Sequence, residues 1–266
     1  MKPLSLQMLA EFCGGSLRGG DAARTVTEVT TDSRKIAPGQ VFFALAGDRF
    51  DGHHFATDVA RAGAAAVVVS RQVAETPDSC AVIEVADTLK ALQRLAHHYR
   101  LWHAPKVIGL TGSNGKTSTK DLTKAVLSRS CQVAATRGNL NNHIGLPLTL
   151  LSLEAGHECA IAEMGMNHAG EIRQLVDIAR PDAAILTHVG RAHIEFLGSQ
   201  DNIAWEKATL PTNVARDGIV VLNANDDYTS RIARHCQASV FTAGIDDGNV
   251  RATNLRADAG GTRFTL

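Results

Sequence analysis

The chain has 266 residues, and its 27 basic side chains balance its 27 acidic ones to a formal net charge of zero. This length suits two domains, and a hydrophobic content of 44% is enough for proper cores. A neutral balance gives no support to a nucleic-acid partner or to binding at an acidic membrane surface.

The cysteines and the amino terminus restrict the class of protein further. Five cysteines are scattered along the chain without a CxxC pair, which argues against a zinc ribbon or a disulfide framework. The amino terminus lacks the apolar region of a signal peptide, and no apolar run is long enough to span a bilayer. We therefore expect a cytoplasmic protein with no membrane insertion.

Residues 1–103 have the pattern of a small α/β domain. In chain order, they predict a helix closed by two glycines, two strands, a helix, two short buried strands and a long amphipathic helix (residues 4–15, 25–34, 39–47, 53–64, 65–70, 80–86 and 88–102). Pro105 disfavours helix at the residue before it, so we place a hinge at residues 103–106.

From residue 104 onward, buried apolar strands alternate with helices. The pattern predicts strands over residues 106–112, 158–165, 182–190 and 218–226, and helices over residues 116–130, 170–180 and 199–215, the last interrupted by Pro211. Such alternation indicates a doubly wound, mostly parallel sheet, in which ligands sit at the carboxyl ends of the strands.

The last residues, 250–266, read as two strands around a Gly-Gly turn, and the chain stops on the second strand. We therefore expect the second domain, residues 104–266, to be incomplete at its carboxyl end and the chain to be a fragment of a longer protein.

The segment TGSNGKTS, residues 111–118, joins the first strand of the second domain to a helix. Its G-x-x-G-K-T spacing is shorter than the usual Walker A loop, but glycines still let the backbone approach phosphate oxygens, and amides at a helix N-terminus point at the anion. Lys116 would add positive charge at the β- and γ-phosphates, and the Thr117 hydroxyl is placed to ligate Mg²⁺. A glycine-rich turn with an incidental lysine is the alternative. The strand-loop-helix context favours phosphate binding by this loop. The residues that we expect to hold the phosphates, those of ATP if the ligand is a nucleotide, are Gly112, Ser113, Asn114, Gly115, Lys116, Thr117 and Ser118.

The short loop resembles that of the Mur ligase family, the ATP-dependent amide-forming enzymes of peptidoglycan precursor synthesis. The stretches RGNLNNHIGLPLTLL, AEMGMNHAGEI, THVGRAHIEFLGS and LNANDD follow it in the family's order. The stretch TDSRKIAPGQVFFALAGDRFDGHHF resembles the UDP-sugar domain of the family's last two ligases. Within the family, GNLNNHIGLP and EMGMNHAGEI resemble the enzyme that adds D-alanyl-D-alanine rather than the one that forms the tripeptide. The resemblance covers essentially the whole chain and implies a UDP-sugar domain over residues 1–103 and an ATP-binding domain over residues 104–266.

Three further side chains are candidates for a metal site. Glu163 ends a strand at the carboxyl edge of the sheet, where a carboxylate can hold Mg²⁺, although it could also be a surface glutamate. The resemblance identifies Glu163 and His193 with the family's metal-site residues and leaves His188 structural. Lys207 would ordinarily be a surface lysine of a helix. The resemblance implies that CO₂ carbamylates it, which turns a cation into an anion that can orient Mg²⁺.

The remaining candidates are polar loop residues, which could equally serve turns, helix caps or surface salt bridges. The resemblance assigns Asn223 and Asp227 to ATP. Arg34 could pair with a phosphate in bidentate fashion or form a surface salt bridge. The residues that the resemblance assigns to the UDP-sugar peptide substrate are Asp32, Ser33, Arg34, Asp51, Gly52, His53, Asn139, Asn141, Asn142, Asn167 and His168.

The resemblance implies a reaction in which a carboxylate is activated. The terminal carboxylate of UDP-N-acetylmuramoyl-tripeptide attacks the γ-phosphate of ATP, and the amine of D-alanyl-D-alanine attacks the resulting acyl phosphate. Lys116, Lys207 and His193 are the expected catalytic residues. The resemblance also implies a third, carboxyl-terminal domain that carries the incoming amine, so we expect this chain to be inactive alone. We separately expect a monomer. The alternatives are the tripeptide-forming ligase of the family and a non-catalytic nucleotide-binding module.

Overall fold

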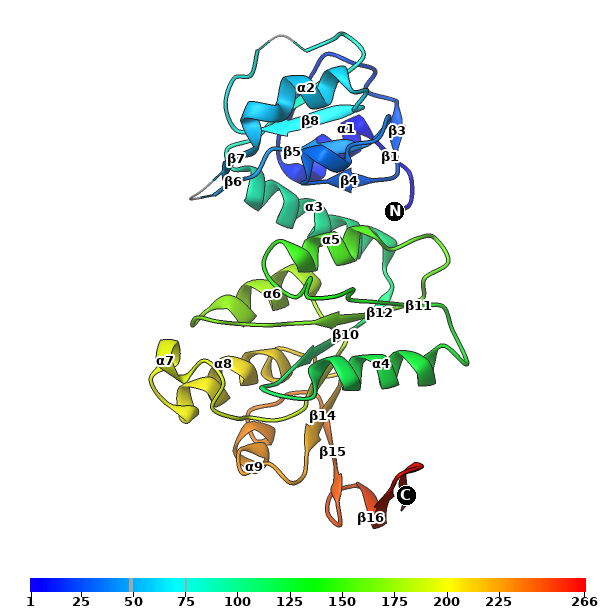
Figure 1. The fold of residues 1–266 in the computed structure, drawn as a ribbon, viewed down its shortest axis with the longest axis vertical. Helices are drawn as coiled ribbons and strands as arrows, with labels where there is room; N and C mark the ends of the chain where they lie inside the picture. Colours follow the sequence, from blue (N-terminus) through cyan, green and yellow to red (C-terminus); the bar gives the residue numbers. More distant parts are fainter. Residues whose placement is uncertain (48–49, 75) are drawn as a thin grey trace. The chain divides into compact units, whose positions relative to one another are not determined.

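The computed structural model describes residues 1–47, 50–74 and 76–266, and it divides the chain into two compact units (Figure 1). The first unit comprises residues 1–105 and 143–157, and the second comprises residues 106–142 and 158–266. The first boundary falls inside the expected hinge. Residues 143–157, which the sequence pattern left in the second domain, belong to the first unit.

Residues 143–157 belong to the first unit because the apolar helix α5 (Gly145–Leu151) packs against α3 (Thr88–His103). Leu146 and Leu150 of α5 are fully buried. Tyr99 of α3 is also fully buried, and its hydroxyl donates a hydrogen bond to Leu153 O just beyond α5. The segment 143–157 therefore contributes to the core of the first unit.

The first unit is built on a five-stranded sheet of order β2-β9-β8-β5-β4. Only the β2–β9 pair is antiparallel. Two small ladders, β1–β3 and β6–β7, lie outside this sheet. The strands are β1 (Leu4–Ser5), β2 (Ser16–Arg18), β3 (Thr25–Val26), β4 (Val29–Thr30), β5 (Val41–Phe43), β6 (Ala46–Gly47), β7 (Phe50–Asp51), β8 (Ala66–Val69) and β9 (Ala81–Glu84), and the remaining helices are α1 (Leu6–Cys13), η1 (Ser33–Lys35), η2 (Gly52–Phe55) and α2 (Ala56–Arg61).

Two regions expected as single strands each form two. Residues 25–34 contain β3 and β4, and residues 39–47 contain β5 and β6. In both cases the two strands have different partners, because β3 pairs with β1 and β4 with β5, while β5 pairs with β8 and β6 with β7. A strand that changes partners must break, and alternation along the sequence does not show where.

The second unit is a doubly wound α/β domain. Its eight-stranded sheet has the order β11-β12-β10-β13-β14-β15-β16-β17, parallel except for the final β16–β17 hairpin. Helices α6 and α8 lie on one face and α4 on the other (Figure 1). The strands are β10 (Lys106–Thr111), β11 (Val133–Ala135), β12 (Cys159–Glu163), β13 (Ala183–Leu186), β14 (Ile219–Asn223), β15 (Ser239–Ile245), β16 (Val250–Asp258) and β17 (Gly261–Thr265), and the helices are α4 (Lys116–Leu127), α6 (Glu171–Ala179), α7 (Ile194–Leu197), α8 (Gln200–Thr212) and α9 (Thr229–Ala233). The predicted fold class is confirmed.

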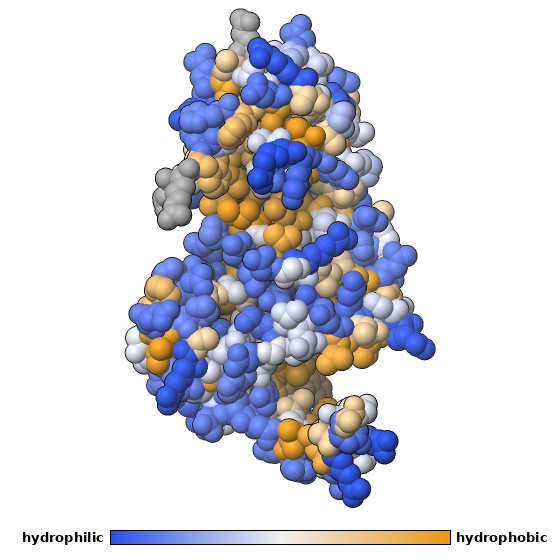
Figure 2. Space-filling model, viewed as in Figure 1, coloured by the Kyte–Doolittle hydropathy of each residue, from blue (hydrophilic) through white to orange (hydrophobic). Residues whose placement is uncertain are grey.

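Exposed apolar side chains of the second unit gather on α4 and on the last strands. Leu122 and Val126 of α4 are 69% and 70% exposed. Further exposed residues of this kind are Phe241, Ile245, Val250, Leu255 and Phe264. Hydrophobic surface is visible over these elements in Figure 2. In the part of the chain that the structure describes, no helix is long and apolar enough to cross a membrane.

Candidate functional site

The loop of residues 112–115 connects β10 to α4 at the carboxyl edge of the sheet. A Cβ at position 112 would lie 1.9 Å from Thr187 Oγ1. The close approach of this loop to Thr187, which directly follows β13, therefore requires glycine at position 112. Gly115 has a φ of 79° and is the N-cap of α4, to which it offers no side-chain cap. The first-turn amides of α4 are therefore left to bind an anion, as in other phosphate-binding loops.

Two ammonium groups converge on this loop. Lys116 Nζ and Lys207 Nζ donate to the same carbonyl oxygen, Gly112 O, at 2.8 and 3.1 Å. Lys207, on α8, is only 2% exposed. Burial, reinforced by the positive charge of Lys116, lowers the pKa of Lys207 from 10.5 to about 8. A larger fraction of Lys207 is therefore the neutral amine near neutral pH, which is the form that can react with CO₂.

Glu163, at the end of β12, is the acidic centre of the site. It is 3% exposed, and its two carboxylate oxygens accept hydrogen bonds from Thr117 Oγ1 at 3.3 Å and from Asn141 Nδ2 at 3.0 Å. The structure thus brings together two of the expected metal residues, Thr117 and Glu163, and one expected substrate residue, Asn141. Hydroxyl and carboxylate oxygens are ligands that Mg²⁺ prefers, so this pair fits the ion.

Among the contacts that the structure describes, none links His193 to Thr117, Glu163 or Asn141. His193 precedes α7 in a left-handed conformation with a φ of 67°, and it is half-buried. Within the described residues, no three His, Cys, Asp or Glu side chains cluster as a metal site. The assignment of His193 to the metal stays a prediction. Carbamylated Lys207, a bound substrate or water could supply a further ligand.

One of the two expected ATP residues at the end of β14, Asn223, belongs to a second group of polar residues beside the loop. Asn223 Nδ2 donates to Thr187 O at 2.9 Å, and Thr187 Oγ1 donates to Asn114 O at 2.6 Å. The side chain of Asp226, which sequence reasoning missed, is 5% exposed and contacts His188 Nδ1 at 2.9 Å. The neighbouring Asp227 is exposed. Asp226 therefore holds the segment that follows β13, at His188 and Val189. In the sequence, its place in NANDD was the only sign of this role.

Two glutamates hold the expected substrate residues Asn167 and His168 and the start of α6 that follows them. Glu171 accepts from the backbone amide of Asn167 at 2.6 Å and contacts His168 Nδ1 at 3.3 Å. Glu206, beside Lys207, accepts from the amides of Gly170 and Ile172, both at 2.9 Å. Sequence reasoning missed this role of Glu206, which ties the start of α6 to the helix that carries Lys207.

The loop between β11 and α5 carries the expected asparagines. Asn139 O accepts from the amide of Asn141 at 2.8 Å, and Asn141 O accepts from the amide of Gly165 at 2.9 Å. Ser113 Oγ, in the phosphate loop, accepts from Gly190 N at 2.8 Å, whereas Ser118 is exposed on α4. Of these asparagines, Asn141 contacts Glu163. Substrate binding by Asn139 and Asn142 stays a prediction.

In the first unit, the expected substrate residues pair with one another. Arg34 forms a bidentate ion pair with Asp32 at 2.8 and 2.9 Å, flanking Ser33. The Arg34 hydrogen bond lowers the pKa of Asp32 to about 2. Of the two alternatives for Arg34, a phosphate contact or a surface salt bridge, the structure contains the salt bridge.

A second polar group of the first unit surrounds η2. Asp51 caps η2, contacts His53 Nδ1 at 2.6 Å and pairs with Arg71. His53 Nε2 accepts from Ser70 N at 2.9 Å, and a side chain at Gly52 would meet Leu45 O at 2.8 Å. These contacts fix the loop after β7. The GDRF part of the resemblance includes Asp48 and Arg49, which lie outside the described residues.

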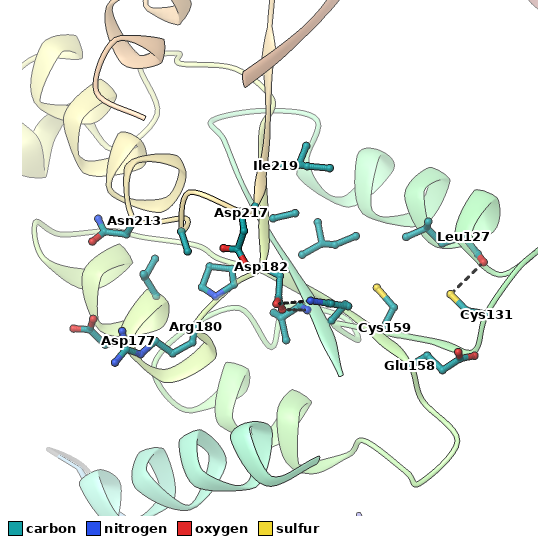
Figure 3. A pocket seen from close by; sticks show the side chains of 18 of the residues that line it. Leu127, Cys131, Glu158, Cys159, Asp177, Arg180, Asp182, Asn213, Asp217 and Ile219 are labelled. Atoms are coloured by element: carbon teal, nitrogen blue, oxygen red, sulfur yellow. Dashed lines mark hydrogen bonds and ion pairs between the residues drawn. The ribbon is translucent and has the colours of Figure 1, made fainter. Parts of the chain in front are cut away.

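A pocket of about 820 Å³ lies elsewhere in the second unit (Figure 3). Its lining includes the first residues of four parallel strands: Lys106, Cys159, Ala183 and Ile219. The phosphate loop follows the carboxyl end of β10, so this pocket lies at the opposite edge of the sheet. Asp182, which accepts from Val107 N and Lys106 Nζ, already has partners there (Figure 3). None of the expected site residues lines it.

Comparison with known proteins agrees with this geometry. Residues 110–266 match the Mur ligase middle domain, and residues 25–100 match the Mur ligase family, catalytic domain. The chain is 41% identical over 263 residues to the UDP-N-acetylmuramoyl-tripeptide--D-alanyl-D-alanine ligase of Bacillus subtilis, covering 98% of this chain and 57% of that protein.

Solved structures show the same relationship. A crystal structure of MurF from Acinetobacter baumannii superposes with a TM-score of 0.90 at 33% identity over 99% of this chain and 60% of that one. MurF ligase from Thermotoga maritima, solved in complex with ADP, gives a TM-score of 0.81 at 30% identity over 90% of this chain and 55% of that one.

The fold and the loop define an α/β protein with a phosphate-binding loop at the carboxyl edge of its central strand. The chain belongs to the Mur ligase family, as its motifs predicted. It spans 57–58% of the length of the first two curated relatives that it matches.

Proposed function

We propose that the protein carrying this sequence is an ADP-forming ligase that joins D-alanyl-D-alanine to UDP-N-acetylmuramoyl-tripeptide at the expense of ATP. The names of the relatives support the substrates, and the Thermotoga complex supports the nucleotide. Because the chain covers little more than half of these relatives, the complete reaction is proposed for the full-length protein. For this chain alone we propose nucleotide binding without turnover.

The observation that carries the proposal is the arrangement around Gly112. Lys116 and Lys207 donate to Gly112 O, beside the open first-turn amides of α4. On the same helix, Thr117 contacts the buried carboxylate of Glu163. Cationic groups that surround a polyphosphate, with hydroxyl and carboxylate oxygens beside them for a metal, are what phosphoryl transfer requires.

Thr117 and Glu163 would hold Mg²⁺, and carbamylated Lys207 and His193 would complete the site. Bound there, Mg²⁺ supplies charge neutralisation between the γ-phosphate and the attacking carboxylate. The chain's own contribution is positioning. Lys116 and the amides of α4 hold the phosphates, and the Asn139–Asn142 loop, together with Asn167 and His168, orients the acyl substrate.

In the proposed reaction, an oxygen of the tripeptide's terminal carboxylate attacks the γ-phosphorus, and the bond to the β-γ bridging oxygen breaks to release ADP. The amine of D-alanyl-D-alanine then attacks the acyl carbon, and phosphate leaves as the amide forms. The site must hold carboxylate and phosphate in line and keep water away from the acyl phosphate. Because the proposed substrates are ATP and a nucleotide-linked sugar, we place the reaction in the cytoplasm, with the enzyme as a monomer.

Calorimetric titration of the chain with UDP-N-acetylmuramoyl-tripeptide, against the dipeptide form, tests the proposed step. We expect the tripeptide to bind at least about tenfold more tightly, a difference of roughly 1.4 kcal/mol. Tighter binding of the dipeptide form would contradict the assignment to this step and favour the tripeptide-forming ligase, whereas equal affinities would leave the step undecided. In the full-length protein, Lys116→Ala should reduce D-alanyl-D-alanine-dependent phosphate release at least about a hundredfold. A non-catalytic module would show no such release even in the wild type.

A further inference from the structure

Lys120 lies on α4 one turn after Lys116 and is the buried residue of that helix. It is 5% exposed, although both neighbours of the lysine in the sequence, Thr119 and Asp121, are more open to solvent. Its Nζ donates to Thr136 O at 3.0 Å and lies 3.4 Å from Asp121 Oδ1. Burying an ammonium is costly unless it is paired and hydrogen-bonded, so its retention here calls for a gain elsewhere.

Thr136, the partner of Lys120, is attached directly to the backbone of Glu163. Thr136 Oγ1 accepts from Glu163 N at 2.9 Å, and Thr136 N donates to Ile161 O at 3.0 Å. Thr136 is fixed at the end of β11 by these contacts. A shift of Thr136 would therefore shift the strand end from which the Glu163 carboxylate projects.

These contacts form a closed ring of four residues. Thr117 Oγ1 contacts Glu163 Oε2 at 3.3 Å, Glu163 N donates to Thr136 Oγ1, and Lys120 Nζ donates to Thr136 O. Thr117 and Lys120 are three residues apart on α4 and share a face of the helix, which closes the ring. The ring fixes the Thr117 hydroxyl relative to the Glu163 carboxylate.

The same ring also anchors the asparagine loop. Thr136 begins the stretch that leads to Asn141, which donates to Glu163 Oε1 at 3.0 Å and accepts from Gly165 N. The loop is thus attached to β12 at both ends, and Lys120 attaches its first end to the phosphate-loop helix. The other described contact of Lys120 is the ion pair with Asp121, whose side chain is exposed and lies outside the ring.

We propose that Lys120 is a positioning residue that sets the geometry between Thr117 and Glu163, and so governs the affinity of the site for the magnesium form of the nucleotide. The identity of the ligand rests on the proposed function, whereas the positioning itself does not. The contacts of Lys120 are with Thr136 and Asp121, whereas Lys116 and Lys207 converge on Gly112 O in the phosphate loop. The effect of Lys120 passes through Thr136, as outer partners of metal ligands commonly act.

The first test measures nucleotide binding to the 266-residue chain by calorimetry, with ADP in the presence and absence of Mg²⁺. Lys120→Met should weaken binding roughly 10–100-fold with Mg²⁺ and leave the Mg²⁺-free affinity within about twofold. Lys124→Met, four residues further on the same helix at an exposed position, is the matched control and should change neither affinity. Lys120→Gln, which keeps a donor without the charge, should give an intermediate loss.

The second test needs no ligand and covers the case in which a variant is less stable. Hydrogen exchange should speed up at least about tenfold at the amides of Glu163 and Gly165 in Lys120→Met, relative to amides in the first unit. Unchanged exchange at both amides, or equal losses of affinity with and without Mg²⁺, would overturn the proposal. If the wild type bound no nucleotide, the proposed function would be contradicted, and the exchange experiment would still decide the role of Lys120.

Discussion

The charged residues of the two candidate sites are satisfied in opposite ways. In the first unit, arginines pair with carboxylates: Arg34 with Asp32, and Arg71 with Asp51. In the second unit, Lys116 and Lys207 share one backbone carbonyl, and within the described residues neither ammonium pairs with a carboxylate. The first arrangement is neutral, whereas the second leaves two positive charges at the N-terminus of a helix.

This difference indicates how each unit can recognise a ligand. A neutral ion pair adds little to the local potential, so these two pairs would contribute to ligand recognition mainly by shape and hydrogen bonds. Two unpaired ammonium groups beside free helix amides attract a polyphosphate, and they lower the stability of the folded chain until it binds. The unpaired ammonium groups therefore make the second unit less stable while they attract an anion, whereas the ion pairs of the first unit have no such cost.

Replacing Lys207 by methionine should have the largest effect, and it should act in opposite directions on activity and stability. Without the ammonium or its carbamate, turnover by the full-length protein should fall at least about a thousandfold, as for other groups that stabilise charge in the transition state. The 266-residue chain should become more stable by up to about 3 kcal/mol at pH 7, because the desolvation penalty disappears. Chemical denaturation measures the stability, with the exposed Lys124→Met as control. A less stable Lys207→Met chain would contradict the comparison.

The cost in stability of burying the Lys207 ammonium should depend on pH. The pKa of Lys207 in the folded chain, about 8, lies below its ordinary value of 10.5, so between these values the unfolded chain binds more protons and stability rises with pH. The stability gap between Lys207→Met and the wild type should be full below pH 8 and close as the pH rises toward about 10.5. Denaturation in carbonate-free buffer avoids the carbamate. A gap that stayed constant would show that another group accounts for the difference.

Substituting alanine at Gly112 should have the next largest effect. The new Cβ would lie 1.9 Å from Thr187 Oγ1, which itself donates to Asn114 O. We expect a loss of about 1–3 kcal/mol in the free energy of unfolding and weaker nucleotide binding, because two loops must move apart. The double variant Gly112→Ala/Thr187→Ala should recover part of the loss. Simple addition of the two single effects would mean that the residues are not in contact.

Much of the second unit could be predicted from the sequence, because strand and helix periods alternate clearly and the phosphate loop has a fixed context. The burial of α4 could not. Its apolar residues Leu122 and Val126 face solvent, while Lys120 is buried, so a hydrophobic pattern assigns the wrong face to the core. The side of a helix that carries a buried charge depends on its partner in space, here Thr136.

Partners distant in the sequence account for the other omissions. Glu206 caps amides that are 34 and 36 residues away, and α5 is too short and too uniformly apolar to show which core it joins. Asp226 rather than Asp227 points into the site because the turn after β14 sets their directions. In each case the sequence indicated the segment, but which of its residues makes the contact depends on tertiary packing.

Substituting alanine for Arg34 should have the smallest effect. It tests the neutral Asp32–Arg34 ion pair of the first unit. The pKa of Asp32 is about 2, chiefly because Arg34 donates to its carboxylate, so Arg34→Ala should raise this pKa toward its ordinary value of 3.8. A carboxyl NMR titration measures the shift. Lys35→Ala is the control, because Lys35 Nζ lies 3.8 Å away and is the least of the causes, so its shift should be smaller.

The same titration in the presence of the UDP-linked tripeptide decides what the Asp32–Arg34 pair does. If Arg34 keeps its bidentate contact when substrate binds, the pKa of Asp32 should stay near its low value, and the first unit recognises its ligand with the pair intact. If a phosphate of the substrate takes Arg34 instead, the carboxylate loses its donor and the pKa should rise in the wild type. A rise would contradict the neutral arrangement that separates the first unit from the second, because both units would then offer free cations to phosphate.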